Sequence, residues 1–323
     1  MSDTYIRHPG HARPPEPAYR TARGALFVGA AEDALTGPAL ADYRGRVQLV
    51  FTSPPFPLHR PKKYGNRSGD EYARWLAGFA PKLAALLPPA GSIVVELGNG
   101  WNPGEPTVST LGIKALIAFQ EAAGLHLCQE FICFNPARLP TPAEWVSVRR
   151  TRVKDAFTRV WWLSTTPHPK ADNRKVLTEY SDAMRRLLKR GTYSSGRRPS
   201  EHRIGKRSFL ADNGGSIVPN VLVPPDADEP AVQAVLPIAN THSKSGYHQK
   251  CRDAQVPRHP AAMPEALARF FVQFLTDPGH VVLDPFAGSN TTGAVAEELG
   301  REWVGIEADA EYARTSQVRF AAG

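Results

Sequence analysis

Residues 52–56 read Thr-Ser-Pro-Pro-Phe and directly follow an apolar run that has the composition of a buried strand. Pro54 and Pro55 end that strand in a stiff turn, and the turn carbonyls can accept hydrogen bonds. Ser53 adds a hydroxyl acceptor, and Phe56 adds a flat apolar face. Two acceptors, Ser53 Oγ and the Pro54 carbonyl, could localise the lone pair of an exocyclic amine on a nucleobase while Phe56 stacks on the base. A strand that simply ends in a proline-rich turn is the alternative, and this segment alone does not separate the two.

A second segment, residues 281–309, has the pattern of a strand, a loop of small residues, a helix and another strand. The candidate ligand-binding residues of this unit are Asp284, Pro285, Phe286, Ala287, Gly288, Ser289, Asn290, Thr291 and Glu307. Such a loop lets a ligand approach backbone N–H groups at a helix start, and an acid closing the next strand can accept ribose hydroxyls. The loop lacks the dinucleotide glycine pattern and the P-loop lysine, which disfavours NAD and ATP. An ordinary βαβ crossover with an exposed acid is the alternative to a site for a nucleoside-containing ligand.

Taken together, the two segments make the chain resemble the β-class DNA amino-methyltransferases, in which the target-amine motif precedes the cofactor loop. Serine rather than aspartate at position 53 resembles the cytosine-N4 branch. The likeness to the PvuII-type modification enzymes of that branch extends over most of the chain from about residue 24. The further segments that resemble these enzymes are 64–66, 134–136, 139–140, 144–146, 152–156, 160–162, 212–217 and 288–293.

The resemblance implies an α/β fold with a mostly parallel, Rossmann-like sheet and S-adenosylmethionine as the cofactor. It implies transfer of a methyl group to the N4 amine of a cytosine that is flipped out of a short duplex site, with CAGCTG as the target. It also implies double-stranded DNA as the partner and restriction-modification as the setting, with a cognate endonuclease that forms no stable complex. A DNA adenine-N6 methyltransferase on the same fold and a catalytically silent, sequence-specific DNA-binding protein are the alternatives.

Glu96 is a further candidate for the site. It lies near the end of an apolar strand and precedes a short glycine-containing loop, which in a parallel sheet marks the ligand edge. The resemblance places a carboxylate here, usually aspartate, near the target amine. Glu96 would orient Ser53 or accept a proton, and a structural acid at a strand end is the alternative. The methylated amine is itself very acidic, so a strong general base is not required.

Two positions on the cofactor side differ in how well they match the family. His259 lies in a segment that resembles the motif preceding the glycine loop, although a histidine before a proline can also be a turn residue. The resemblance places an aspartate at position 30, where this chain has alanine. Glu32 or Asp33 is therefore expected to take over its contact with the cofactor, or the contact is missing.

Basic residues are concentrated in the segment 138–207, which contains 18 Lys and Arg against 6 Asp and Glu, although the net charge of the whole chain is only +8. A basic segment that also carries tryptophans favours a polyanionic partner, and a solvated charged face is the alternative. The residues expected to contact DNA are Arg149, Arg150, Arg152, Lys154, Arg197, Arg198, Lys206 and Arg207.

The order of apolar strands and amphipathic helices predicts an alternating α/β chain with an insertion. We expect a loose N-terminal arm (1–23), a catalytic and cofactor-binding domain (24–134 and 256–323) and a target-recognition region (135–255). Helices are expected over 72–87, 111–123, 180–189 and 266–275. No apolar run is long enough to span a membrane, and the N-terminus has no signal-peptide pattern, so a cytoplasmic enzyme is expected. The three cysteines lack metal-ligand spacing, and no metal is expected.

Overall fold

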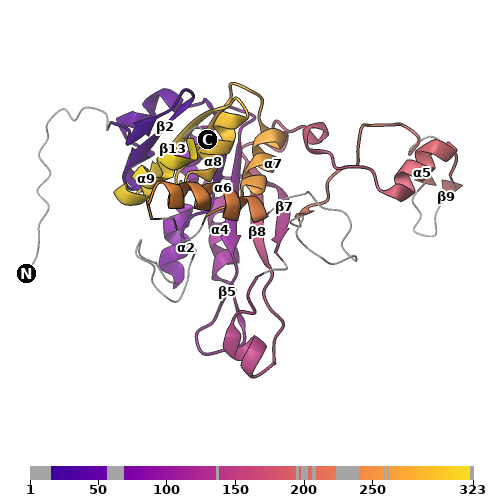
Figure 1. Ribbon diagram of the computed structural model, residues 1–323, viewed down its shortest axis with the longest axis horizontal. Coiled ribbons are helices and arrows are strands. Elements are labelled where there is room, and N and C mark those ends of the chain that lie inside the picture. The colour runs from indigo at the N-terminus through magenta and orange to yellow at the C-terminus, as the bar shows by residue number, and fades with distance from the viewer. Residues whose placement is uncertain are drawn as a thin grey trace, which may run out of the picture.

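The computed structural model describes residues 16–56, 69–135, 138–193, 196–197, 203–205, 209–222, 240–257, 259 and 262–320. A nine-stranded sheet lies at its centre, in the order β1-β2-β13-β12-β3-β4-β8-β7-β11 (Figure 1). Its strands are β1 (Tyr19–Arg20), β2 (Gly24–Val28), β3 (Val47–Thr52), β4 (Ser92–Gly98), β7 (His126–Phe134), β8 (Phe157–Ser164), β11 (Val221–Leu222), β12 (Val281–Asp284) and β13 (Glu302–Glu307). Strands β2, β13, β12, β3 and β4 are parallel, whereas β8 runs antiparallel to both β4 and β7. The predicted fold class, a mostly parallel α/β sheet, is confirmed.

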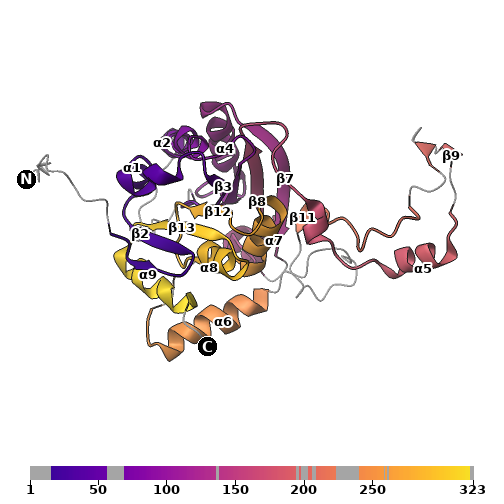
Figure 2. The ribbon, with the colours of Figure 1, turned by 90° about the horizontal axis from the view of Figure 1, so that it is seen from above.

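Helices cover both faces of this sheet, which explains why its central strands are continuous apolar runs (Figure 2). The helices on one face are α1 (Ala31–Ala34), α2 (Gly69–Ala77), α3 (Ala80–Ala84) and α4 (Leu111–Ala122). Those on the other face are α7 (Glu265–Leu275), α8 (Thr291–Glu298) and α9 (Ala310–Ser316), with α6 (Asn240–Asp253) lying outside α7. None of the helices in the described residues has the length and apolar character needed to cross a membrane.

The helix expected over 72–87 is divided in two. Gly78 lies between α2 and α3, and Pro81 is placed in the first turn of α3. A proline inside a continuous helix would remove an N–H and collide with the preceding turn, whereas it is tolerated in a first turn. The expected helices over 111–123 and 266–275 correspond to α4 and α7, and the one over 180–189 corresponds to α5 (Asp182–Arg190).

Strands of the central sheet lie within both the expected N-terminal arm and the expected target-recognition region. Tyr19, which falls in the expected loose arm, is buried and belongs to β1, which pairs with β2. Strands β8 and β11 fall in the expected region 135–255 and yet belong to the central sheet. Helix α6 was not expected, because its sequence is polar and contains Gly246.

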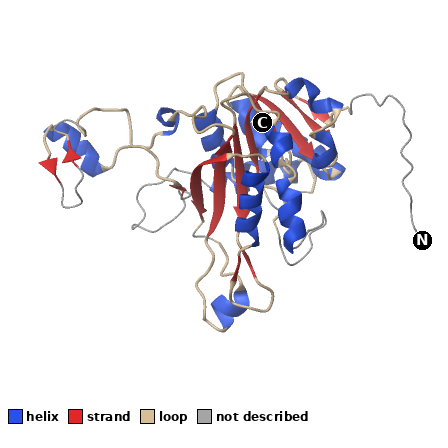
Figure 3. Ribbon diagram, turned by 180° about the vertical axis from the view of Figure 1, so that it is seen from behind, coloured by secondary structure: helices blue, strands red, loops and turns tan. Residues whose placement is uncertain are grey.

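Two parts of the chain project from this body, as Figures 1 and 3 show. The lower projection connects β7 to β8 and contains the short π-helical segment η2 (Glu144–Val148), near the hairpin of β5 (Gly100–Trp101) and β6 (Val108–Ser109). The side projection, which we call the side arm, is residues 177–220. It contains α5, β9 (Gly196–Arg197) and β10 (Arg203–Ile204). The remaining short helices are η1 (Pro38–Tyr43), η3 (Asn173–Val176) and η4 (Gln317–Phe320).

Candidate active site

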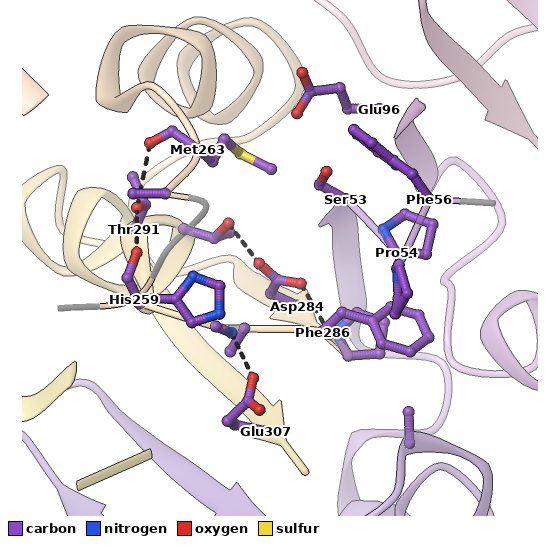
Figure 4. A pocket seen from close by; sticks show the side chains of 18 of the residues that line it. Ser53, Pro54, Phe56, Glu96, His259, Met263, Asp284, Phe286, Thr291 and Glu307 are labelled. Atoms are coloured by element: carbon purple, nitrogen blue, oxygen red, sulfur yellow. Dashed lines mark hydrogen bonds between the residues drawn. The ribbon is translucent and has the colours of Figure 1, made fainter. Parts of the chain in front are cut away.

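The two motifs that lie more than 200 residues apart in the sequence meet at one edge of the sheet. β3 and β12 are parallel neighbours, so Ser53 after β3 and Asp284 at the end of β12 lie at the same carboxyl edge, where ligands bind in open α/β sheets. A cavity of about 790 Å³ opens there (Figure 4). The residues expected for the site that line it are Ser53, Pro54, Pro55, Phe56, Glu96, His259, Asp284, Pro285, Phe286, Ala287, Gly288, Ser289, Thr291 and Glu307.

At one end of the cavity, the carboxylate of Glu96 lies beside the Ser53 turn (Figure 4). Glu96 is buried, and its Oε1 accepts a hydrogen bond of 2.9 Å from Thr158 Oγ1. Burial raises the pKa of Glu96, and hydrogen bonds from Thr158 and Ser53 offset part of this rise. Ser53 and Glu96 both line this end of the cavity (Figure 4), where the lone pairs of Ser53 Oγ can accept from an incoming donor. The orienting role of Glu96 stays a prediction.

The proline turn is held from both sides. Tyr72 on α2 donates from its hydroxyl to the Pro55 carbonyl at 2.9 Å, next to the Pro54 carbonyl that is expected to accept from an amine. The ring of Phe56 lies directly on Gly98, where a Cβ atom would come within 2.5 Å of a ring carbon. A glycine at this position is therefore needed for the ring to lie where it does.

The loop after β12 is built around the buried carboxylate of Asp284. Its Oδ1 accepts from Thr52 Oγ1 at 2.7 Å and from the Phe286 N–H at 3.1 Å, and its Oδ2 accepts from Thr292 Oγ1 at 2.8 Å. Burial raises the pKa of Asp284 to about 6 despite these bonds. Asp284 thus shapes the loop and connects it to the end of β3.

Glu307 closes the opposite side of the loop. Its carboxylate accepts from the N–H of Gly288 at 2.8 Å and from the N–H of Asp309 at 2.9 Å. Gly288 has a φ of 52°, a left-handed conformation that favours glycine, which brings its N–H to the carboxylate. Asn290 is fully buried behind the loop rather than among the residues lining the cavity. Its side chain caps α8 and donates to the Tyr19 hydroxyl at 2.9 Å.

His259 and Glu32 complete the cofactor side. The backbone N–H of His259 donates to the Tyr247 hydroxyl on α6 at 3.1 Å, and its ring meets the edge of Tyr312 with 4.6 Å between centroids. Glu32 lines the cavity and accepts from Trp75 Nε1 at 2.6 Å. Of the two acids expected to replace the missing aspartate at position 30, Glu32 is therefore the one that reaches the cavity.

The residues expected to contact DNA differ in their surroundings. Arg149 is exposed and forms an ion pair of 2.7 Å with Glu144, and the side chain of Arg152 is only 13% exposed and pairs with Asp155 at 3.0 Å. Arg150 and Lys154 are exposed. Arg197 is the last residue of β9, but the placement of its side chain lies outside the described part, as do Arg198, Lys206 and Arg207 altogether.

Several residues of the site were missed by sequence reasoning. Thr52, Tyr72 and Gly98 hold the two motifs in place, and their contacts depend on tertiary packing. Thr158 reaches Glu96 because β4 and β8 are antiparallel with Gly98 opposite Thr158, a register that no local pattern reveals. Arg138 lines the same end of the cavity and donates to the Phe157 carbonyl at 3.0 Å.

Residues 47–318 match the N6_N4_Mtase family, described as DNA methylase. The chain is also 41% identical over 307 residues to the type II methyltransferase M.PvuII of Proteus hauseri, across 94% of this chain and 86% of that protein. The chain belongs to the DNA methylase family. Among solved structures, the cytosine-N4-specific PvuII DNA methyltransferase matches this DNA methylase with a TM-score of 0.72 and 34% identity, covering 96% of this chain and 90% of that one.

A more distant structure shares the fold alone. TTHA0409, a putative DNA modification methylase of Thermus thermophilus complexed with S-adenosyl-L-methionine, matches with a TM-score of 0.53 and 19% identity. The match covers 93% of this chain and 95% of that one. The DNA methylase fold therefore extends over nearly the whole chain.

Proposed function

We propose that this DNA methylase is a site-specific cytosine-N4 methyltransferase that uses S-adenosylmethionine. The observation that carries the proposal is the cavity in which the Ser53 turn faces the Asp284 loop. Its volume of about 790 Å³ lies within the range of roughly 300–1,000 Å³ that is usual for ligand sites. When bound, the cofactor supplies an electrophilic methyl group on a sulfonium.

The residues on the cofactor side fit such a group. The carboxylate of Glu307 is anchored by two backbone N–H groups and is suited to accept hydrogen bonds from ribose hydroxyls. Phe286 and His259 provide ring surfaces at the cavity wall, and Glu32 provides a carboxylate for an ammonium group. The bond from Gly288 to Glu307 fixes the loop against the end of β13.

The residues at the other end of the cavity fit an aromatic amine. The exocyclic amine of cytosine is a weak nucleophile because its lone pair is delocalised into the ring. Ser53 Oγ and the Pro54 carbonyl would accept its two hydrogens and localise the lone pair, and Glu96 would keep the Ser53 hydroxyl turned away from the amine. Placing the amine in line with the methyl group supplies most of the remaining acceleration. Serine rather than aspartate at position 53 favours cytosine over adenine.

The amine is hidden in a paired duplex, so the target base must leave the helix before transfer, at a cost of a few kcal/mol. Stacking of Phe56 on the flipped base would offset part of this free-energy cost, and phosphate contacts of the basic segment would offset the rest of it. We propose CAGCTG as the target and the cytoplasm as the location, both by likeness to the PvuII enzyme. A restriction endonuclease of the same specificity, acting without a stable complex, is the proposed companion.

Product analysis tests the proposal directly. The protein is incubated with S-adenosylmethionine carrying a labelled methyl group and with duplexes that contain CAGCTG or a scrambled site, and the DNA is digested to nucleosides. We expect labelled N4-methylcytosine from the CAGCTG duplex alone. Labelled N6-methyladenine would identify the adenine-specific alternative, and specific binding without label in any duplex would identify a silent DNA-binding protein.

Exposed and paired arginines of the lower projection should behave differently in DNA binding. Arg150→Ala should weaken binding to all duplexes similarly and reduce the salt slope by about 1, because an exposed arginine can neutralise a phosphate. Arg152→Ala should leave the salt slope unchanged and lower the melting temperature, because Arg152 is paired with Asp155. Binding to cognate and scrambled duplexes over a salt series measures both. The assignment fails if Arg150→Ala keeps the wild-type slope.

Gly98→Ala should displace the Phe56 ring, because a Cβ atom there would overlap it. Loss of a base–aromatic stack costs about 1–3 kcal/mol, so transfer at low DNA concentration should fall about 10- to 100-fold while cofactor affinity is kept. Gly78→Ala is the matched control, since a Cβ atom there has its nearest neighbour at 3.4 Å. Single-turnover assays that gave equal rates for both variants would contradict the stacking role of Phe56.

A further inference from the structure

The ladder between β3 and β12 stops short of the site. Its registered pairs end with Val50 opposite Leu283, whereas the reacting motifs begin beyond them. Past that point, a side-chain bond from Thr52 Oγ1 to Asp284 Oδ1, 2.7 Å long, continues the connection between the strands. Thr52 is the residue directly before Ser53, and Asp284 is the first residue of the cofactor loop.

The side chains that form this connection are buried, and both carboxylate oxygens of Asp284 are hydrogen-bonded. The exposed fractions of Thr52, Asp284 and Thr292 are 2%, 3% and 1%. Each carboxylate oxygen of Asp284 receives one threonine hydroxyl, Thr52 from the side of the target-amine motif and Thr292 from the side of the loop and α8. A buried carboxylate with directed donors has one favourable orientation, because leaving any of these groups unpaired is costly.

We infer that Thr52 is a positioning residue, whose hydroxyl ties Asp284 to the end of β3 and thereby fixes the Ser53 hydroxyl relative to the cofactor loop. This inference rests on the proposed methyltransferase function. Methyl transfer requires the amine and the methyl donor to lie in line, and a displacement of about 1 Å can cost on the order of 100-fold in rate. Thr52 would act on this alignment without touching either substrate.

The two threonines should therefore affect different steps. Thr52→Val retains the shape of the side chain and removes the hydroxyl, while the bonds of Asp284 to Thr292 and Phe286 remain to hold the loop. We expect cofactor affinity to be kept and the single-turnover rate at saturating substrates to fall about 10- to 100-fold. Thr52→Ser, which restores a hydroxyl, should restore most of the rate. Thr292→Val, the matched variant on the loop side, should weaken cofactor binding instead.

The measurements are calorimetric titration with S-adenosylmethionine, single-turnover transfer to a cognate duplex, and thermal melting of each variant. An unchanged rate in Thr52→Val, or a loss of rate that Thr52→Ser does not recover, would overturn the inference. If Thr52→Val does not fold, Thr52→Ala is judged by the same two criteria. Wild-type protein that binds the cofactor but methylates no duplex would refute the proposed function instead, so the two failures are distinguishable.

Discussion

Ser53→Ala is expected to reduce methyl transfer about 100- to 1,000-fold while leaving cofactor affinity unchanged, since one lost hydrogen bond at a developing charge costs about 2.7–4 kcal/mol. The Ser53 hydroxyl lines the cavity beside the proline turn, and its oxygen is proposed to accept from the amine. Its removal therefore takes away one of the two proposed acceptors. Single-turnover transfer and calorimetry on the same preparation measure the two effects.

A serine at the opposite edge of the sheet provides the control for Ser53. Ser92 begins β4, is fully buried, and accepts a hydrogen bond of 2.9 Å from Trp162 Nε1. Ser92→Ala should lower the melting temperature and leave the transfer rate of the folded protein intact. If Ser53→Ala transferred methyl groups at the wild-type rate, the assignment of the target-amine site to this turn would be wrong.

Glu307→Ala is expected to weaken S-adenosylmethionine binding about 10- to 100-fold, because hydrogen bonds to a charged group are worth about 1.5–3 kcal/mol. The carboxylate is held by the N–H groups of Gly288 and Asp309, so its loss also releases the loop. Glu307→Gln separates the two effects, because an amide oxygen can still accept from Gly288 but carries no charge. We expect Glu307→Gln to lie between the wild type and Glu307→Ala in affinity.

Glu311 provides the charge control for Glu307. It is exposed on α9, so Glu311→Ala removes the same charge near the same strand end without touching the cavity. Calorimetric titration with the cofactor should give wild-type affinity for Glu311→Ala. Equal affinities for Glu307→Ala and the wild type would show that the ribose side of the cofactor lies elsewhere.

The sequence predicted the fold class and the family because both depend on strong local signals. Apolar runs at β3 and β12 and the motifs that follow them are local patterns, and the comparisons confirm the methyltransferase prediction built on them. The roles of individual site residues stay predictions, although the structure gathers most of them around one cavity.

What sequence reasoning missed depends on contacts between distant segments. The bond of Thr158 to Glu96 requires an antiparallel register, and the fit of Phe56 on Gly98 requires the β3 turn to fold over the end of β4. Asn290 matched a cofactor motif, yet its amide is used inside the protein, where it bonds with Tyr19 of a segment expected to be loose. Hydrophobic periodicity indicates which face of a helix or strand is apolar, but it does not indicate which distant residue that face will contact.

The position of the side arm, residues 177–220, bears on how enzymes of this architecture could acquire new DNA targets. Among the described residues, none from 159 to 257 lines the cavity, so the described part of the side arm lies outside the space where the chemistry is proposed to occur. If the side arm takes part in the proposed target recognition, selection on it would change the preferred sequence while Ser53 and Asp284 stay under separate constraint. On that condition, the side arm would be exchangeable as a unit between such enzymes, and a library diversified only there would explore specificity at little risk to turnover.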